Sequence, residues 1–197
     1  MIFLDAERFK EAKITLTLIL VNIICFFLFG LALPEKYIFA LVQINSKILT
    51  DYEIWRLVTP IFLHSDLLHL FSNMFALLIF GTTIETDPKI SKLEFVLIFF
   101  ISGLIGNVAS LFLLPPYVIS LGASGAIFGL IGVVFIMVAI ENRSLLPFTL
   151  IYIVYFIAAS FMPGINIWAH IFGLLGGILC GFFFYYRRRD FTNPYYK

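Results

Sequence analysis

The sequence predicts an all-α polytopic membrane protein with six transmembrane helices. Of its 197 residues, 61% are hydrophobic and 13% are charged, and the mean hydropathy is +1.03. Ordinary soluble domains are about 45–50% apolar and about 25% charged. Apolar runs close to the roughly 20 residues that a spanning helix needs recur along the chain. This composition excludes a soluble globular domain, a disordered chain, a coiled coil and a disulfide scaffold. Six helices would use roughly 120 residues, so residues 1–197 are expected to form a single membrane domain.

The first helix is expected at about residues 14–33. Thr15, Thr17 and Asn22 are the only polar interruptions of this run. The alternative is a signal peptide, whose apolar core is about 7–15 residues long and is followed by a small-residue cleavage site. This run is longer and ends in Leu-Ala-Leu-Pro. It therefore predicts a retained membrane helix.

Residues 34–65 are expected to form an interfacial loop. The segment contains six charged residues, Glu35, Lys36, Lys47, Asp51, Glu53 and Arg56. It is also rich in large apolar side chains, and Trp55 is of the type that anchors a segment at headgroup depth. The segment should therefore lie half sunk in the membrane surface.

Five further helices are expected, separated by segments that contain charged residues, proline or glycine. Their ranges are about 66–84, 93–113, 123–140, 146–162 and 168–186. Asp66 or Ser65 can cap the second helix. The short separators make neighbouring helices antiparallel.

The distribution of Lys and Arg predicts the orientation. Ten of them fall on one side of the predicted spans: Arg8, Lys10, Lys13, Lys89, Lys92, Arg143, Arg187, Arg188, Arg189 and Lys197. Three fall on the other: Lys36, Lys47 and Arg56. Cytoplasmic loops carry the excess of positive charge, so both termini are expected in the cytoplasm, in a protein of the cell membrane. The net charge of +1 gives no reason to expect a nucleic-acid partner.

Polar residues inside the predicted spans converge at one depth. His69 and Asn73 lie in the first two turns of the second helix, Ser124 starts the fourth, and His170 lies in the first turn of the sixth. All three helices begin at the outer face in the predicted orientation. No Asp or Glu lies in mid-span, which argues against a proton-relay pump or an ion-coupled carrier.

Glycines predict that the fourth and sixth helices touch. Gly125 and Gly129 lie on the fourth helix, and Gly173 and Gly177 on the sixth. Small residues four apart allow two membrane helices to approach backbone to backbone, which would bring Ser124 to His170. A hydroxyl becomes a nucleophile when an imidazole removes its proton, so the pair predicts a Ser–His dyad.

The oxyanion formed by such a dyad needs preorganised donors. The candidates are His69, the Asn73 amide and the backbone N–H of Ser124. A structural serine and a metal site made of His64, His69 and His170 are the alternatives. The sequence has no HExxH motif and no thiol or carboxylate at usable spacing, so neither a metal nor another cofactor is expected.

Four ordered motifs resemble those of the rhomboid family of intramembrane serine proteases. Gly122-Ala123-Ser124-Gly125 resembles its GxSG motif, and the segment 169–177 resembles its AHxxGxxxG motif. The segment 64–73 resembles HxxxxHxxxN, and Trp55-Arg56 resembles a pair in the first loop. Together these motifs cover the chain from about residue 50 to residue 180.

The resemblance implies a six-helix core with a water-filled cavity open to the outside. It implies Ser124 as nucleophile, His170 as base, and His69, Asn73 and the Ser124 backbone as oxyanion donors. Structural roles are implied for Trp55, Arg56 and Glu85. Phe128 falls where many members carry a Tyr that packs on the base.

The implied substrates are other transmembrane proteins, cut near the outer membrane boundary, with the fifth helix and the loop 163–167 as gate and cap. No obligate protein partner is evident. Two other functions stay open at this point: a catalytically inert rhomboid-like protein that binds clients, and a small carrier or channel.

Overall fold

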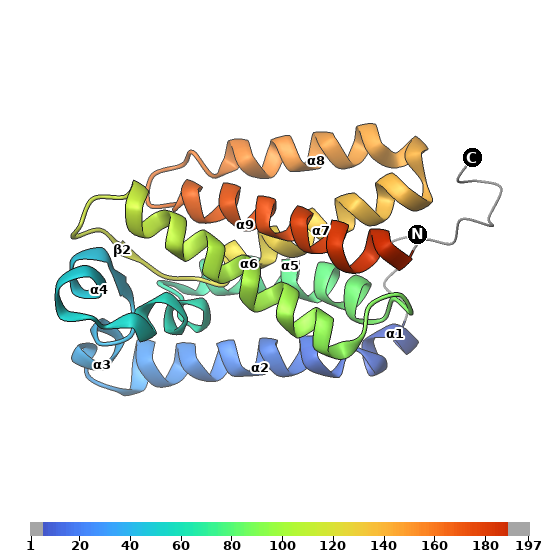
Figure 1. Cartoon of the computed structure of the whole chain (residues 1–197). Helices are drawn as coiled ribbons and strands as arrows, with labels where there is room; N and C mark the ends of the chain where they lie inside the picture. Colours follow the sequence, from blue (N-terminus) through green and yellow to red (C-terminus); the bar gives the residue numbers. More distant parts are fainter. Residues whose placement is uncertain (1–5, 189–197) are drawn as a thin grey trace.

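The computed structural model describes residues 6–188 as a bundle of helices that run side by side (Figure 1). The α-helices are α1 (Ala6–Glu11), α2 (Lys13–Phe27), α3 (Glu35–Phe39), α4 (Asn45–Asp51), α5 (Leu67–Glu85), α6 (Lys92–Leu113), α7 (Ser124–Glu141), α8 (Leu146–Ala159) and α9 (Ile167–Cys180). Shorter helical segments are η1 (Leu28–Ala32), η2 (Ile54–Leu57), η3 (Thr59–Phe62), η4 (Arg143–Leu145), η5 (Gly181–Tyr185) and η6 (Tyr186–Arg188). One antiparallel pair of short strands joins β1 (Gln43–Ile44) to β2 (Ile119–Ser120). The predicted all-α polytopic class is confirmed.

Five helices in the described part of the chain are long and apolar enough to cross a membrane. They are Lys13–Ala32, Leu67–Glu85, Lys92–Leu113, Ser124–Glu141 and Ile167–Tyr185, each within a few residues of a predicted span. The remaining prediction, 146–162, is too long. α8 ends at Ala159 with Ser160 as its C-cap, and the chain turns through Gly164 at φ +83°. This sixth apolar helix is therefore shorter than the others.

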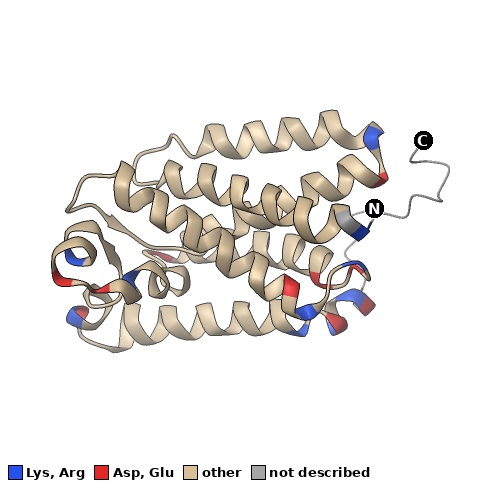
Figure 2. Cartoon of the chain, viewed as in Figure 1, with Lys and Arg blue, Asp and Glu red and all other residues tan. Residues whose placement is uncertain are grey.

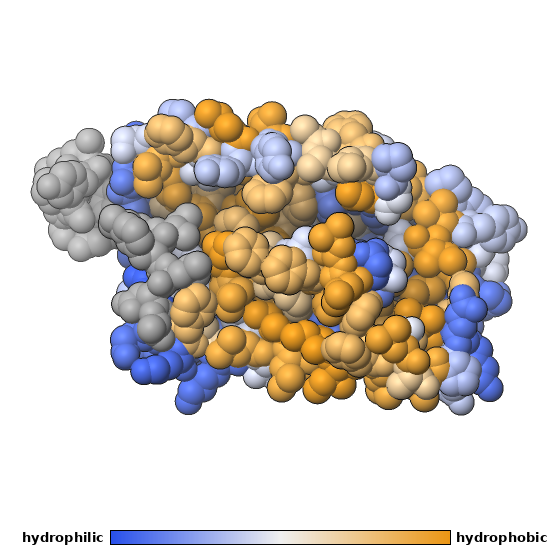
Figure 3. Space-filling model, turned by 180° about the vertical axis from the view of Figure 1, so that it is seen from behind, coloured by the Kyte–Doolittle hydropathy of each residue, from blue (hydrophilic) through white to orange (hydrophobic). Residues whose placement is uncertain are grey.

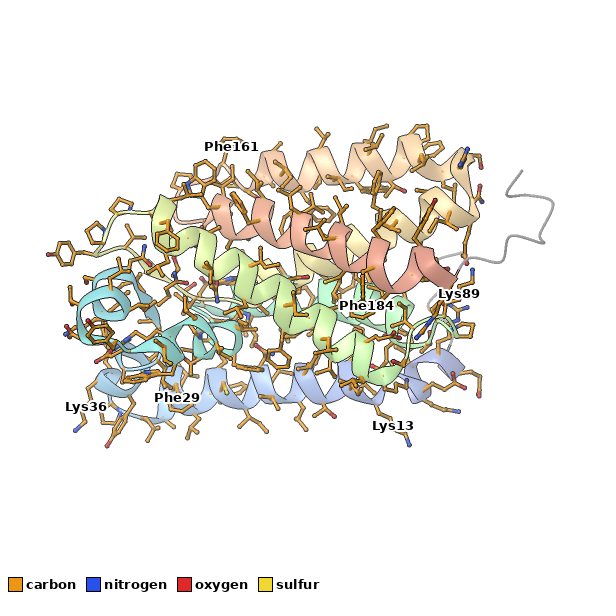
Figure 4. The ribbon with its side chains drawn as sticks, viewed as in Figure 1. Lys13, Phe29, Lys36, Lys89, Phe161 and Phe184 are labelled. Atoms are coloured by element: carbon orange, nitrogen blue, oxygen red, sulfur yellow. The ribbon has the colours of Figure 1, made fainter. Side chains whose placement is uncertain are left out.

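Lys, Arg, Asp and Glu residues gather towards the two ends of the bundle, and the ribbon between these ends carries few of them (Figure 2). Hydrophobic residues make up most of the middle of the face seen in Figure 3, with a few hydrophilic residues among them. Lys13 and Lys89 lie at one end and Lys36 at the other (Figure 4), which matches the two groups of basic residues in the sequence. Which end faces the cytoplasm stays a prediction. Residues 1–5 and 189–197, including the Arg189 and Lys197 used in that prediction, lie outside the described residues.

Helix α7 forms the centre of the bundle. It packs against α5, α6 and α9, and most of its residues are buried. Such a helix has apolar residues all round and no polar face. α8, in contrast, lies at the periphery (Figure 1), and none of its 14 described residues is buried.

Glu85 joins the ends of α2, α5 and α6. The N-cap residue of α2, Ala12, offers no side-chain cap. The Glu85 carboxylate instead accepts hydrogen bonds from the backbone N–H groups of Ile14 (3.0 Å) and Thr15 (2.7 Å). It also accepts one from the Lys92 ammonium at 3.0 Å. A carboxylate at a helix N-terminus satisfies otherwise unpaired donors, so this buried side chain fastens the first span to the rest of the bundle.

The segment predicted as an interfacial loop folds into α3, β1, α4, η2 and η3. Arg56 is buried and donates through Nη1 to the carbonyls of Phe39 (2.6 Å) and Val42 (2.7 Å). Trp55 donates through Nε1 to the Ala40 carbonyl at 3.1 Å, and its indole stays half exposed. These bonds fix the shape of the loop from inside. Its pairing with β2 then ties the loop to the segment that leads into α7.

Candidate active site

Ser124 is the first residue of α7, at the end of a tightly held connection from β2. Gly122 has φ +128°, a conformation that glycine adopts without steric cost. Its N–H donates to the Pro60 carbonyl at 2.9 Å. A β-carbon on Gly122 would lie only 2.7 Å from His69 Nε2 and 3.8 Å from Ser124 Oγ. Because Gly122 has no side chain, the space between His69 Nε2 and Ser124 Oγ stays open.

His170 lies in the first turn of α9, with its Nε2 atom 2.7 Å from Ser124 Oγ. The two residues are 46 positions apart, and the short distance joins the amino ends of two different helices. His170 is buried. The ring of Phe128 stacks on its imidazole, with centroids 4.2 Å apart and planes 14° apart. The imidazole thus faces the hydroxyl in a geometry that allows direct proton transfer.

The four glycines of the predicted helix contact lie where α7 meets α9. A β-carbon on Gly173 would lie 2.1 Å from the Gly125 carbonyl oxygen, and one on Gly177 would lie 1.8 Å from that of Gly129. Both neighbours are backbone atoms. Gly106 of α6 is a further close contact, not expected from the sequence, because a β-carbon there would lie 2.6 Å from the Ala169 oxygen. α9 is therefore in backbone contact with two helices beside His170.

His69 and Asn73 come from the first turns of α5. Asp66 caps this helix through a 2.8 Å hydrogen bond from the His69 N–H. Asn73 Nδ2 donates to the His69 carbonyl at 2.8 Å. One of the two amide hydrogens of Asn73 is therefore engaged within α5, and the other is left for a ligand. The ring of His69 contacts Ser65 Oγ through Nδ1 at 3.1 Å.

A cavity of about 850 Å³ brings these groups together. Its lining includes six residues of interest: His69, Asn73, Ser124, Phe128, Ser160 and His170. A cavity of this size is in the range that binds small ligands or a short stretch of peptide. The cavity is lined by residues of α5, α7, α8 and α9, and further polar side chains come from β2 and from the segments that precede α5 and α9: Ser65, Asp66, Ser120 and Asn166.

Sequence reasoning gave no function to Ser160, the C-cap of α8. Its Oγ lies 2.6 Å from His170 Nδ1, and its side chain is 2% exposed. The sequence predicted a Ser–His dyad, in which no carboxylate orients the base. In the structure, the hydroxyl of Ser160 lies beside Nδ1 of His170, where the carboxylate of a triad would lie. The only hint in the sequence was a serine near the end of an apolar run.

His64 lies in the loop before α5, as expected, but is fully buried beside His69, with ring centroids 4.9 Å apart. Burial, together with the smaller effect of the neighbouring His69, lowers the pKa of His64 to about 3. Among the described residues, no group of three or more His, Cys, Asp or Glu side chains is placed to hold a metal ion. The metal site considered from the sequence therefore has no support from the geometry.

Comparisons with known proteins agree with this geometry. A family profile described as the Rhomboid domain matches residues 51–187. YdcA of Bacillus subtilis (strain 168) is 39% identical over 137 residues, covering 66% of this chain and 67% of YdcA. Rhomboid protease GluP of the same organism is 35% identical over 184 residues, covering 88% of this chain and 35% of GluP.

A plant protein is also similar. RHOMBOID-like protein 6, mitochondrial, of Arabidopsis thaliana is 36% identical over 144 residues, covering 70% of this chain and 46% of the relative. The matched part thus spans about two thirds of the first relative and less than half of the other two.

Proposed function

Because this chain belongs to the rhomboid family, we propose that it is an intramembrane serine endopeptidase. The observation that carries the proposal is the 2.7 Å contact between Ser124 Oγ and His170 Nε2 inside a cavity. Ser124 is the nucleophile and His170 is the general base. The reaction needs no cofactor.

In the first step, His170 Nε2 accepts the Ser124 proton while Oγ attacks the carbonyl carbon of the scissile peptide bond. The resulting tetrahedral intermediate carries its negative charge on the former carbonyl oxygen. Its donors are the Ser124 N–H, the remaining Asn73 amide hydrogen and His69. The first N–H groups of a helix have no intrahelical partner, and the N-terminus carries a partial positive charge. The start of α7 therefore favours this oxyanion.

In the second step, the intermediate collapses and the leaving amine takes the proton from His170. An ester of Ser124 remains. Water then attacks this ester with His170 again acting as the base, and the carboxylic acid product leaves as the Ser124 hydroxyl is restored. Removing one oxyanion donor typically costs about 10²–10³ in rate, so each donor contributes substantially to catalysis.

The substrates are the transmembrane segments of other proteins. A helical peptide bond hides its carbonyl in the backbone hydrogen bonds of the helix, so a segment must unwind before Oγ can reach it. α8 and the loop 163–167 border the cavity and are the elements that admit the substrate. In the orientation that the basic residues predict, both termini are cytoplasmic, the protein lies in the cell membrane and the site opens outward.

Two other functions make different predictions. A catalytically inert relative that binds clients has no need of a Ser–His contact, and this chain keeps both residues within hydrogen-bonding distance. A carrier or channel would tolerate Ser124→Ala. The contact favours the enzyme over both.

Labelling with a fluorophosphonate probe tests the proposal directly. The detergent-solubilised protein is expected to react, and peptide mapping is expected to find the adduct on Ser124. Ser124→Ala and His170→Ala should not label. Ser102→Ala removes a buried hydroxyl of α6 that has no hydrogen-bond partner among the described residues, so it serves as the matched control and should label normally. A wild-type protein that stays unlabelled, or one labelled elsewhere, would overturn the proposal.

A further inference from the structure

The hydroxyl of Ser160 faces the side of His170 that is remote from Ser124. Ser160 Oγ lies 2.6 Å from His170 Nδ1 and 2.8 Å from the carbonyl oxygen of Phe156, one turn earlier in α8. The two imidazole nitrogens therefore have different hydroxyl partners. Nε2 faces Ser124 on α7, and Nδ1 faces Ser160 at the end of α8.

The single hydrogen of the Ser160 hydroxyl can serve only one of its two contacts, the one with Phe156 or the one with His170. A serine hydroxyl has one hydrogen, and a carbonyl oxygen can only accept. If Ser160 donates to Phe156, its oxygen must accept from His170, so the proton of the neutral ring lies on Nδ1. Nε2 is then bare and faces the Ser124 hydroxyl as an acceptor. This is the tautomer that a general base for Ser124 requires.

The stacking of Phe128 on the His170 ring does not select between the Nδ1–H and Nε2–H tautomers. Phe128 stacks flat against the imidazole and fixes its plane, but a stacked ring does not distinguish a proton on Nδ1 from one on Nε2. In the Nε2–H tautomer, the ring would donate toward Ser124 and could not take its proton. Within residues 6–188, the hydrogen-bond partner of His170 Nδ1 is Ser160.

We propose that Ser160 is a positioning residue that holds His170 in the Nδ1–H tautomer and stabilises the imidazolium formed when Ser124 attacks. This inference rests on the proposed function. Because the hydroxyl belongs to α8, whose own residues are not buried, the alignment of the base depends on a helix with little packing of its own. Any displacement of the end of α8 from α9 removes the partner of Nδ1.

The tautomer can be read directly by NMR of protein with ¹⁵N-labelled imidazoles. The spectrum is recorded at about pH 8, well above the ordinary imidazole pKa of about 6.5, and the His170 signals are assigned by their loss in His170→Ala. In the wild type we expect a protonated Nδ1 and a bare Nε2. In Ser160→Ala we expect a mixture of the two tautomers. A wild-type ring that is protonated on Nε2 would overturn the inference without any variant.

Kinetics provide the second test. Ser160→Ala is expected to lower both kcat for a transmembrane substrate and the rate of fluorophosphonate labelling by about tenfold, with KM little changed. Tenfold corresponds to one hydrogen bond worth about 1.4 kcal/mol. Ser160→Thr keeps the hydroxyl and should recover most of both rates. A change in KM alone, with labelling unaffected, would mean that Ser160 acts on substrate entry and not through His170.

Thr149→Ala is the matched control. Thr149 makes the same type of bond to the carbonyl four residues earlier in α8, at 3.0 Å, but on an exposed face. It should leave both rates unchanged, which separates the contact with His170 from a general weakening of the helix. Failure of the inference is also distinct from failure of the proposed function. If wild-type Ser124 labels and Ser160→Ala labels equally fast, only the role of Ser160 is wrong.

Discussion

Substituting Gly177 with alanine should separate α7 from α9 and, with them, the two catalytic groups. The added β-carbon would lie 1.8 Å from the Gly129 oxygen, 2.4 Å from its carbonyl carbon and 2.5 Å from its Cα. Ordinary contacts begin at 3.4 Å, so the backbones must move apart by about 1.6 Å. All three neighbours are backbone atoms, and no side chain can rotate away to relieve the clash.

Moving α7 away from α9 also moves Ser124 away from His170. Ser124 begins α7 and His170 lies in the first turn of α9, so a shift of about 1 Å between the helices stretches their 2.7 Å contact beyond the roughly 3.2 Å limit of a good hydrogen bond. A displacement of this size can cost about a hundredfold in rate. Overpacking a tight contact costs about 1–3 kcal/mol, which exceeds the roughly 1 kcal/mol that alanine gains over glycine in helix propensity. Gly177→Ala should therefore be both less stable and about a hundredfold slower.

The assays are thermal unfolding in detergent and the rate of fluorophosphonate labelling. Gly176→Ala is the matched control on the same helix, because its β-carbon meets the flexible end of Ile105 at 3.0 Å. Gly30→Ala in the first span has nothing nearer than 3.9 Å. Both controls should stay within about threefold of the wild-type rate, as expected for substitutions that a side chain can accommodate. Wild-type stability and labelling in Gly177→Ala would refute the backbone contact between α7 and α9.

Four further outcomes are expected. Gly122→Ala should lower cleavage by at least about a hundredfold, because it strains a backbone at φ +128° and places a β-carbon 2.7 Å from His69 Nε2; normal cleavage would show that this turn can relax. His69→Ala and Asn73→Ala should each reduce kcat by about 10²–10³ and still label slowly, whereas His170→Ala should be inactive; an active His170→Ala with a dead His69→Ala would move the base to α5. The pKa of His64 is about 3 in the folded protein and about 6.5 when unfolded, so the unfolded state binds more protons at intermediate pH. The contribution of His64 to the free energy of unfolding should therefore fall by about 1.4 kcal/mol per pH unit as the pH is lowered from about 6.5 to about 3, and unfolding of His64→Phe at several pH values should lack this contribution. Chelators should leave cleavage unchanged, and inhibition that zinc reverses would revive a metal site.

The spans and the pairing of Ser124 with His170 were predictable because membrane constraints are visible in sequence. A bilayer requires apolar runs of fixed length, so the ends of most helices follow from where the charges begin. The depth of a residue follows from its distance to the end of its run. The faces of two helices that touch follow from their small residues. The membrane depth of a residue and the contact face of its helix together predicted that Ser124 and His170, 46 positions apart, lie in the same site.

The remaining features depend on backbone turns and side-chain rotations that no periodicity describes. Ser160 contacts His170 because α8 stops at Ala159 and the chain turns back through Gly164, and the apolar pattern gave no sign of that early stop. The Asn73 amide was predicted as a candidate oxyanion donor, and one of its two hydrogens is bound to the His69 carbonyl. His64 was predicted to be an interfacial loop residue because it precedes the second helix. Its burial depends on how the loop folds over α5.

The two sides of the His170 ring are controlled by contacts of opposite character. On the Ser124 side, the distance is set by backbone contact between α7 and α9, which cannot change without moving whole helices. On the Ser160 side, the proton position is set by one hydroxyl on a peripheral helix, whose displacement would leave the first distance unchanged. A substrate segment that enters between α8 and the bundle would therefore meet a nucleophile and base already at the correct separation. Entry of the substrate segment would disturb the tautomer of His170, and closure of α8 over the bound segment would restore the Nδ1–H form. In this arrangement a backbone contact between α7 and α9 positions the reacting atoms, and the hydroxyl that holds the proton on Nδ1 stands at the end of a helix with no buried residue.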